Sequence, residues 1–195
     1  MIRAGFTIAN PLTQSRTIVL KSDAETDGMG WLLEVHCAPG ARADIAEHMH
    51  VEWTEHFEIV SGTAHYALDG MQGTIEAGAS FTVLPGQRHI HPWSPGGSPM
   101  VYRQRNEFSR RSPEAVQDVL GVFATVAGLA RDGKVDQTGR PRNPLQLAAT
   151  LRTLNRHGGY DASLPIQVQK ILSATLGRLA EAMGYQGIYE RFVRP

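Results

Sequence analysis

The sequence predicts a mainly β domain, a sandwich or barrel of short antiparallel strands, followed by about three α-helices. Short apolar or alternating segments, separated by Gly and Pro, fill the first half of the chain. The composition changes near Arg110, after which apolar residues recur at helical spacing. We therefore divide the 195 residues into a barrel, residues 1–110, and a helical extension, residues 111–195. No internal repeat is visible, so one barrel is expected.

The strands are predicted from segments of strand composition that end at turn signals. Two extended pieces lie on either side of Asn10-Pro11, and a strand over 31–37 ends at Pro39-Gly40. The dipeptide Asp69-Gly70 predicts a tight hairpin. Of the remaining predicted strands, one carries His48 and His50 and one ends at Ser61-Gly62. Two more begin at residues 73 and 78, and two others span residues 63–68 and 100–107.

Three helices are predicted in the extension. The first begins at Ser112-Pro113-Glu114, which places a capping serine, a first-turn proline and a carboxylate at the positive end of the helix dipole. It continues to Asp132, the second spans 144–154, and the third begins near Leu164 and ends before Gly184. Each carries an apolar stripe that must be buried. The sequence does not decide what covers these stripes. The alternatives are the barrel exterior, the barrel mouth and a second subunit.

A candidate metal site is formed by His48, His50, Glu55 and His89. Alternate residues of a strand share a face, so His48 and His50 can point into a barrel together. Glu55 follows after a bend, and His89 comes just after a Pro-Gly turn. Imidazole and carboxylate ligands suit one divalent ion, Fe, Mn, Zn or Ni, whose identity they do not fix. Four protein ligands on an octahedral ion leave two positions open for a small molecule.

These two segments resemble the paired motifs of the cupin superfamily. The first motif is matched by His48, His50, Glu55 and Gly62, and the second by Gly78, Gly86 and His89. The sequence departs from the pattern where Arg42 occupies the place of the leading glycine, Leu84 that of the proline and Trp93 that of the asparagine. None of these departures affects a ligand. The resemblance covers about residues 30–107.

The resemblance implies an RmlC-like jelly-roll barrel, the cupin double-stranded β-helix, with those four residues as metal ligands. It also implies a homodimer, because cupin barrels commonly pair. Relatives with this ligand set include dioxygenases, isomerases, decarboxylases and cyclases. The sequence therefore favours a metal-dependent enzyme, such as a dioxygenase, that acts on a small organic substrate chelated at a mononuclear site. The alternatives are a non-catalytic metal or small-molecule binder and a sensor.

Residues in phase with the ligands are expected to line the substrate pocket: Trp31, Phe57, Ile59, Phe81 and Trp93. His91, two residues past His89, is a candidate for catalytic proton transfer, with a structural role at the barrel rim as the alternative. The remaining four histidines are expected to be solvated or hydrogen-bonded rather than ligating: His36, His56, His65 and His157.

The charge balance argues against a nucleic-acid partner. Lys plus Arg and Asp plus Glu both total 19, and no basic stripe or helix-turn-helix pattern precedes the barrel. The single cysteine, Cys37, fits a reducing compartment. No segment has the length of a membrane span or the pattern of a signal peptide. A cytoplasmic protein without a membrane partner is expected.

Overall fold

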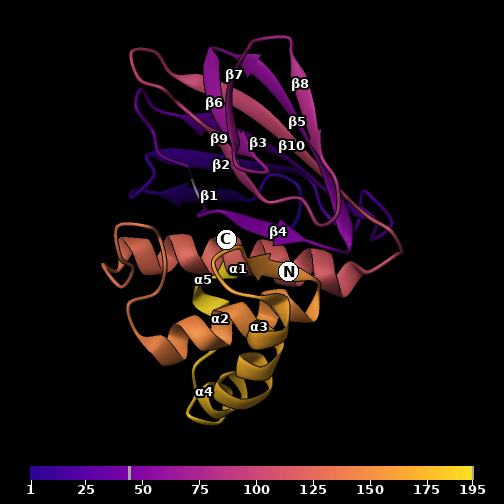
Figure 1. Ribbon diagram of the computed structural model, residues 1–195, viewed down its shortest axis with the longest axis vertical. Helices are drawn as coiled ribbons and strands as arrows, with labels where there is room; N and C mark the ends of the chain where they lie inside the picture. The colour runs from indigo at the N-terminus through magenta and orange to yellow at the C-terminus, as the bar shows by residue number, and fades with distance from the viewer. Residues whose placement is uncertain (44, 195) are drawn as a thin grey trace.

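The computed structural model describes residues 1–43 and 45–194. Two antiparallel sheets face each other, and a layer of helices closes one end of the barrel that they form (Figure 1). The first sheet has the strand order β1-β2-β3-β10-β5-β8, and the second β11-β4-β9-β6-β7. The strands are β1 Thr7–Asn10, β2 Ser15–Lys21, β3 Gly30–Cys37, β4 His48–His50, β5 Trp53–Ser61, β6 Thr63–Leu68, β7 Met71–Glu76, β8 Ser80–Val83, β9 His89–Trp93, β10 Met100–Phe108 and β11 Gly159–Asp161.

The core lies between the sheets and continues into the helical layer. Alternate residues of β3, β5 and β10 are buried, as expected for strands with one face toward a core. Trp31 contacts Phe108 and Phe123, with ring centroids 5.7 Å and 6.4 Å away. Since Phe123 belongs to helix α1, these aromatic contacts join the helical layer to the barrel.

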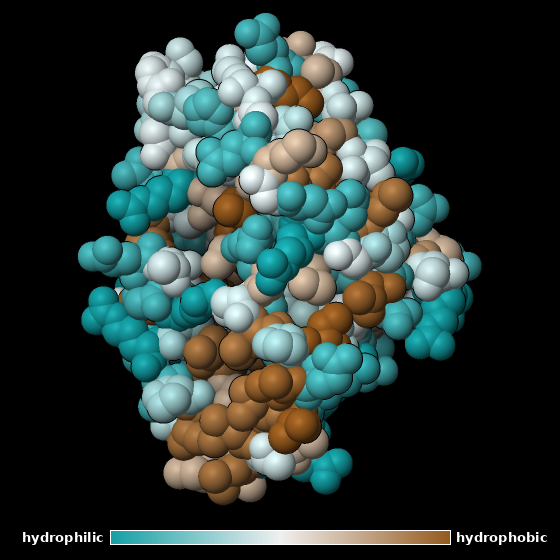
Figure 2. Space-filling model, viewed as in Figure 1, coloured by the Kyte–Doolittle hydropathy of each residue, from teal (hydrophilic) through white to brown (hydrophobic). Residues whose placement is uncertain are grey.

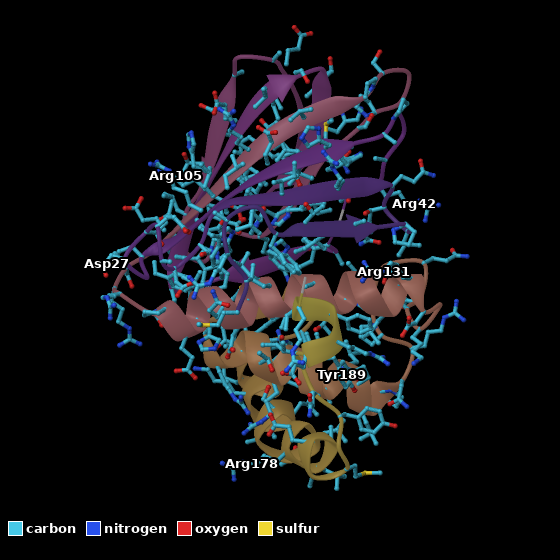
Figure 3. All side chains as sticks on the ribbon, turned by 180° about the vertical axis from the view of Figure 1, so that it is seen from behind. Asp27, Arg42, Arg105, Arg131, Arg178 and Tyr189 are labelled. Atoms are coloured by element: carbon cyan, nitrogen blue, oxygen red, sulfur yellow. The ribbon has the colours of Figure 1, made fainter. Side chains whose placement is uncertain are left out.

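The helices are α1 Pro113–Arg131, α2 Pro144–Arg156, α3 Ile166–Leu172, a π-helical turn Ser173–Gly177, α4 Arg178–Ala182 and α5 Glu190–Val193. The predicted third helix corresponds to α3, the π-helical turn and α4 taken together. Helix α5 was not predicted. Phe192 of α5 packs so closely on α1 that a Cβ at Gly128 would lie 2.3 Å from its ring, which only glycine allows. Figure 3 shows α1 running beneath the sheets, where Arg131 donates to the carbonyl of Ala9.

Strand β11 is the main feature that the sequence did not predict. The Gly158-Gly159 segment, which follows the second predicted helix, leads into a strand that pairs with β4. Its register places Gly159 opposite His50 and Asp161 opposite His48. The helical extension therefore adds an edge strand to the sheet that carries the first two histidines. Three residues are too few to show the alternation that identifies a strand from sequence.

The predicted fold class is confirmed, a jelly-roll barrel followed by helices. Thr63–Leu68 is a strand as predicted, and the hairpin at Asp69-Gly70 is observed with positive φ at both residues. No helix within the described residues is long and apolar enough to cross a membrane.

An apolar surface lies over the last helices. Figure 2 shows brown side chains gathered at the end of the molecule where Figure 1 places α3 and α4. The exposed large apolar residues in this region are Leu164, Val168, Ile171, Leu172, Leu179 and Met183.

Candidate metal centre

Five side chains from three strands converge between the two sheets. His48 and His50 come from β4, His89 and His91 from the neighbouring β9, and Glu55 from β5 of the opposite sheet. His48 and His89 are direct cross-strand partners. One ligand atom from each of His48, Glu55, His89 and His91 lies within 4.8 Å of all the others. The barrel thus brings together donors that lie more than forty residues apart in the chain.

One oxygen of Glu55 lies at the point where the imidazoles meet. Its Oε2 is 2.9 Å from Nε2 of His89, 3.4 Å from Nε2 of His91 and 3.5 Å from Nε2 of His50. The Glu55 side chain is 2% exposed, and the three rings are 0–1% exposed. A carboxylate and several imidazoles removed from water and aimed at one point form the donor set of a divalent cation site.

The strand–turn–strand segment before β9 positions the histidines. Gly86 has a φ of +89°, and its amide donates to the carbonyl of His50 at 2.7 Å, which ties the Pro85-Gly86 turn to β4. Nδ1 of His48 lies 3.0 Å from the carbonyl of Ala46, and Nδ1 of His89 lies 3.3 Å from the carbonyl of Gln87. Backbone contacts at Nδ1 orient such rings with Nε2 toward the site.

The order of these groups along two facing jelly-roll sheets matches both cupin motifs: His-x-His on β4, Glu on β5, and His at the start of β9 after a Pro-Gly turn. The β domain has the cupin jelly-roll fold.

Solved structures with a similar backbone include cupins of several kinds. A predicted oxalate decarboxylase from Thermotoga maritima is 17% identical, over 48% of this chain and 80% of that chain, with a TM-score of 0.45. A double-stranded β-helix protein from Klebsiella pneumoniae is 21% identical over 51% and 81%, with a TM-score of 0.42. An RmlC-like cupin from Shewanella frigidimarina is 18% identical over 53% and 84%, with a TM-score of 0.43. No protein-family model and no curated protein matches the sequence.

Three donors hold the other oxygen of Glu55. Its Oε1 accepts from Nε2 of Gln104 at 3.0 Å, Nδ2 of Asn106 at 2.5 Å and Nε1 of Trp53 at 3.4 Å. Gln104 and Asn106 lie on β10, which pairs with β5 in a register that places Asn106 opposite Glu55. Because these donors engage Oε1, the carboxylate keeps Oε2 directed at the histidines.

His50 carries the clearest evidence that the cupin site fits a metal ion. Its ring is fully buried, and neither ring nitrogen makes a hydrogen bond. The ring stacks on Trp53 with centroids 4.6 Å apart and planes 17° from parallel. A buried nitrogen without a hydrogen bond is costly, and coordination of a cation would satisfy it.

The protonation states also suit a cation. Burial raises the pKa of Glu55, but electrostatic interactions with His50 and His91 and a hydrogen bond with His89 outweigh burial, so the pKa of Glu55 lies well below 4.5. Burial, followed by the repulsion of His89 and His91, lowers the pKa of His48 well below 6.5. An anionic carboxylate and a neutral imidazole are the forms that bind divalent metals.

The structure brings all four predicted ligands together, with differences in detail. His48, Glu55 and His89 belong to the tightest group, and His50 lies beside it, 3.5 Å from Glu55. His91, predicted as a proton-transfer residue, also belongs to this group, with its Nε2 3.4 Å from Oε2 of Glu55. The four histidines expected to be hydrogen-bonded or solvated all lie within 2.9 Å of a polar partner, His36 of Glu34, His56 of Thr82, His65 of Thr74 and His157 of Asp118.

The predicted pocket residues do not line the cavity that reaches this centre. That cavity, of about 140 Å³, includes His48 and Glu55 in its walls but none of Trp31, Phe57, Ile59, Phe81 or Trp93. Phe57 and Phe81 instead stack on each other with centroids 5.0 Å apart, and the Phe57 ring lies 5.2 Å from that of His91. Trp93 packs against His65, 5.8 Å between centroids. Strand alternation correctly indicates inward side chains, yet it does not tell which end of a barrel is open.

Trp53, Gln104 and Asn106 were not singled out from the sequence. Trp53 is two residues before Glu55 and therefore in phase with it, which is a usable signal. Gln104 and Asn106 alternate with Tyr102 and Phe108 on the buried face of β10, so they are polar residues at core positions. A buried polar side chain needs a partner, and here that partner is a ligand of the candidate centre.

Proposed function

We propose that this protein is a metal-dependent cupin enzyme that acts on a small organic substrate, chelated at a mononuclear site. The observation that carries the proposal is the convergence of His89, His91 and His50 on Oε2 of Glu55 in a buried position that also borders a cavity. A purely structural cluster would have no need of a cavity at its side.

The residues have separate tasks in this proposal. Glu55 and His89 would hold the ion together with His48 and His50, and His91 lies within reach as a further ligand. Gln104 and Asn106 fix the orientation of Glu55 through Oε1. When bound, a divalent ion supplies Lewis-acid activation of an oxygen-bearing substrate, and a redox-active ion also supports oxidation. The apolar walls of the cavity exclude water from the reacting groups.

Metal content of the purified protein tests the site. We expect about one divalent ion per chain in the wild type and its loss in His89→Ala and Glu55→Ala, while His65→Ala, a surface histidine on the outer part of the barrel, keeps the ion. Circular dichroism checks that each variant is folded. Stoichiometric metal in both site variants would refute the proposed centre.

The role of His91 is tested by the same measurement combined with a turnover assay. Loss of the ion in His91→Ala identifies His91 as a ligand. A variant that retains the ion but loses turnover has instead lost a group that acts on the substrate, which is the role predicted from the sequence. If the variant keeps both the ion and full turnover, His91 has neither task. A wild-type protein that binds metal and ligand but turns over no oxygen-bearing substrate would be a binding protein rather than an enzyme.

The assembly and the location of the protein remain proposals. We propose a homodimer that acts in the cytoplasm on a small molecule, with no nucleic-acid or membrane partner. Two faces are available for pairing, the outer face of the sheets and the apolar surface over α3 and α4. Light scattering on Val60→Glu and Ile171→Glu, residues 40% and 63% exposed on these two faces, distinguishes them. A monomeric wild type would refute the dimer.

A further inference from the structure

The cavity that reaches the candidate centre is built largely by the helical extension. One wall comes from the barrel and includes His48, Trp53 and Glu55. The facing wall comes from α1 and α2, and the side is closed by β11 and by residues 138–141 of the loop before α2. The apolar residues of the helical wall are Val119, Val122, Phe123, Val126, Ala127, Leu147, Leu151 and Leu154. The barrel thus supplies His48 and Glu55 together with apolar residues such as Leu33 and Trp53, and the helices supply most of the apolar wall.

The size of the cavity limits what it can hold. Its volume is about 140 Å³. An apolar protein cavity of roughly 150 Å³ accommodates benzene, so one six-membered ring matches a cavity of this volume. An apolar wall favours a ring over a flexible polar ligand, because burial of carbon surface provides the binding energy.

The charges around the cavity argue for an uncharged ring. Arg140 is the cationic side chain among its walls, and its Nη2 lies 2.6 Å from Oδ2 of Asp161, which neutralises it. The carboxylates of Glu47 and Glu55 are also among the lining residues. In metal-free protein, a carboxylate or phosphate ligand would meet these negative groups without a free cation in compensation. A hydroxyl or carbonyl oxygen on the ring can instead face His48 and Glu55 at the polar end.

We propose that the cavity binds one uncharged, single-ring molecule that carries a hydroxyl or carbonyl oxygen, and that α1 and α2 set the permitted ring size. The proposal deepens the proposed function, since the oxygen would face the candidate centre. Most of the cavity walls are side chains outside the candidate centre, so recognition of the ring is measurable in metal-free protein.

The test uses the full-length protein stripped of metal and titrated by calorimetry with phenol, cyclohexanol, benzoate and 2-naphthol. Phenol and cyclohexanol are expected to bind. Benzoate, which is charged, and 2-naphthol, which has two fused rings, are expected to bind at least about tenfold more weakly. Leu151→Trp fills the cavity and should weaken phenol binding at least about tenfold. Leu172→Trp, at an exposed position of α3, is the matched control and should bind phenol like the wild type.

A second variant keeps the proposal testable if Leu151→Trp fails to fold. Phe123→Ala removes a ring from the wall and should raise the affinity for 2-naphthol. Equal binding of all four compounds to the wild type, unchanged phenol binding in Leu151→Trp, or unchanged 2-naphthol binding in Phe123→Ala would each overturn the proposal. Failure of the metal proposal would appear separately, as a protein that selects single rings yet holds no ion in the metal analysis.

Discussion

Trp53 supports two residues of the candidate centre at once, since its ring stacks on His50 and its Nε1 donates to Glu55. The ring centroids of Trp53 and His50 are 4.6 Å apart, and the donor–acceptor distance to Oε1 of Glu55 is 3.4 Å. His50 and Glu55 belong to opposite sheets, so one side chain couples the two halves of the cupin barrel. The packing of Trp53 on His50 and its hydrogen bond to Glu55 therefore contribute separately to the stability of the folded protein.

Substitution of Trp53 separates these contributions. Trp53→Phe keeps an aromatic ring against His50 but removes the donor, whereas Trp53→Ala removes both. Trp53 is 4% exposed, so the alanine variant should lose about 3–5 kcal/mol of unfolding free energy, as large buried aromatics do, and the phenylalanine variant clearly less. Urea denaturation of the metal-free proteins measures both. Equal losses in the two variants would show that stacking on His50 contributes little.

Gln104 and Asn106 are predicted to tune metal affinity without binding the ion. Replacement of either by leucine removes a donor to Oε1 of Glu55 and frees the carboxylate to turn. Loss of such a supporting bond lowers metal affinity by about 10–100-fold. Competition with a chelator of known affinity measures the change. Gln72→Leu, on an exposed position of β7, is the control and should bind metal like the wild type. Wild-type affinity in both β10 variants would mean that Glu55 needs no such support.

Much of the candidate centre was predictable because its candidate ligands lie on two short motifs. The His-x-His spacing placed His48 and His50 on one face, and the alternation placed Glu55 inward. The supporting residues were not predictable in the same way. Gln104 meets Glu55 only because β10 pairs with β5, and the order of strands in a sheet is a property of the whole topology rather than of either strand.

The cavity beside the centre lies away from the predicted pocket residues for a related reason. Phe57 and Phe81 pack on each other, and neither lines the cavity that borders the candidate centre. The open side is created by Phe123, Leu147 and Leu151, whose helical stripes the sequence showed clearly without showing what they cover. Local periodicity thus reveals which residues are buried, while their partners depend on contacts between distant segments.

The loop that closes the side of the cavity depends on the ionised carboxylate of Asp136. Its Oδ1 accepts from the amide and hydroxyl of Thr138, at 2.8 Å and 2.7 Å, and from the amide of Arg140 at 3.1 Å. The side-chain hydrogen bond from Thr138 is the largest cause of a pKa below the usual 3.8. A lowered pKa means that folding favours the charged form, so the stabilisation is present above about pH 3.8 and is lost as the pH falls through the lower folded value.

Asp136→Asn should therefore destabilise the protein near neutral pH, and its difference from the wild type should shrink in acid. Unfolding free energies of both proteins, measured from about pH 6 to about pH 2, give this difference directly. Asp27→Asn is the control, because Asp27 is a highly exposed carboxylate with one surface partner, Arg111. A difference that stays constant across the pH range would contradict a role of the charge at Asp136.

The approach of the helical extension to β4 is predicted to depend on Gly158. This residue has a φ of +86°, and an added Cβ would lie 2.5 Å from Cγ of Glu52. Its carbonyl accepts from the amide of Val51 at 2.9 Å, just beyond His50. Gly158→Ala should lose more than the roughly 1–2 kcal/mol that a left-handed conformation costs an L-residue. Gly184→Ala is the matched control, since Gly184 has a φ of +89° with no atom within 4 Å of an added Cβ.

The two glycine variants also test the link between the extension and the candidate centre. Because β11 follows Gly158 directly and pairs with the strand that carries His48 and His50, displacement of β11 should increase hydrogen exchange at the amide of Val51 and weaken metal binding. Gly184→Ala carries the same backbone strain far from β4 along the chain, and it should change neither quantity. Equal effects of the two variants on metal binding would show that the extension stabilises the protein without shaping the site.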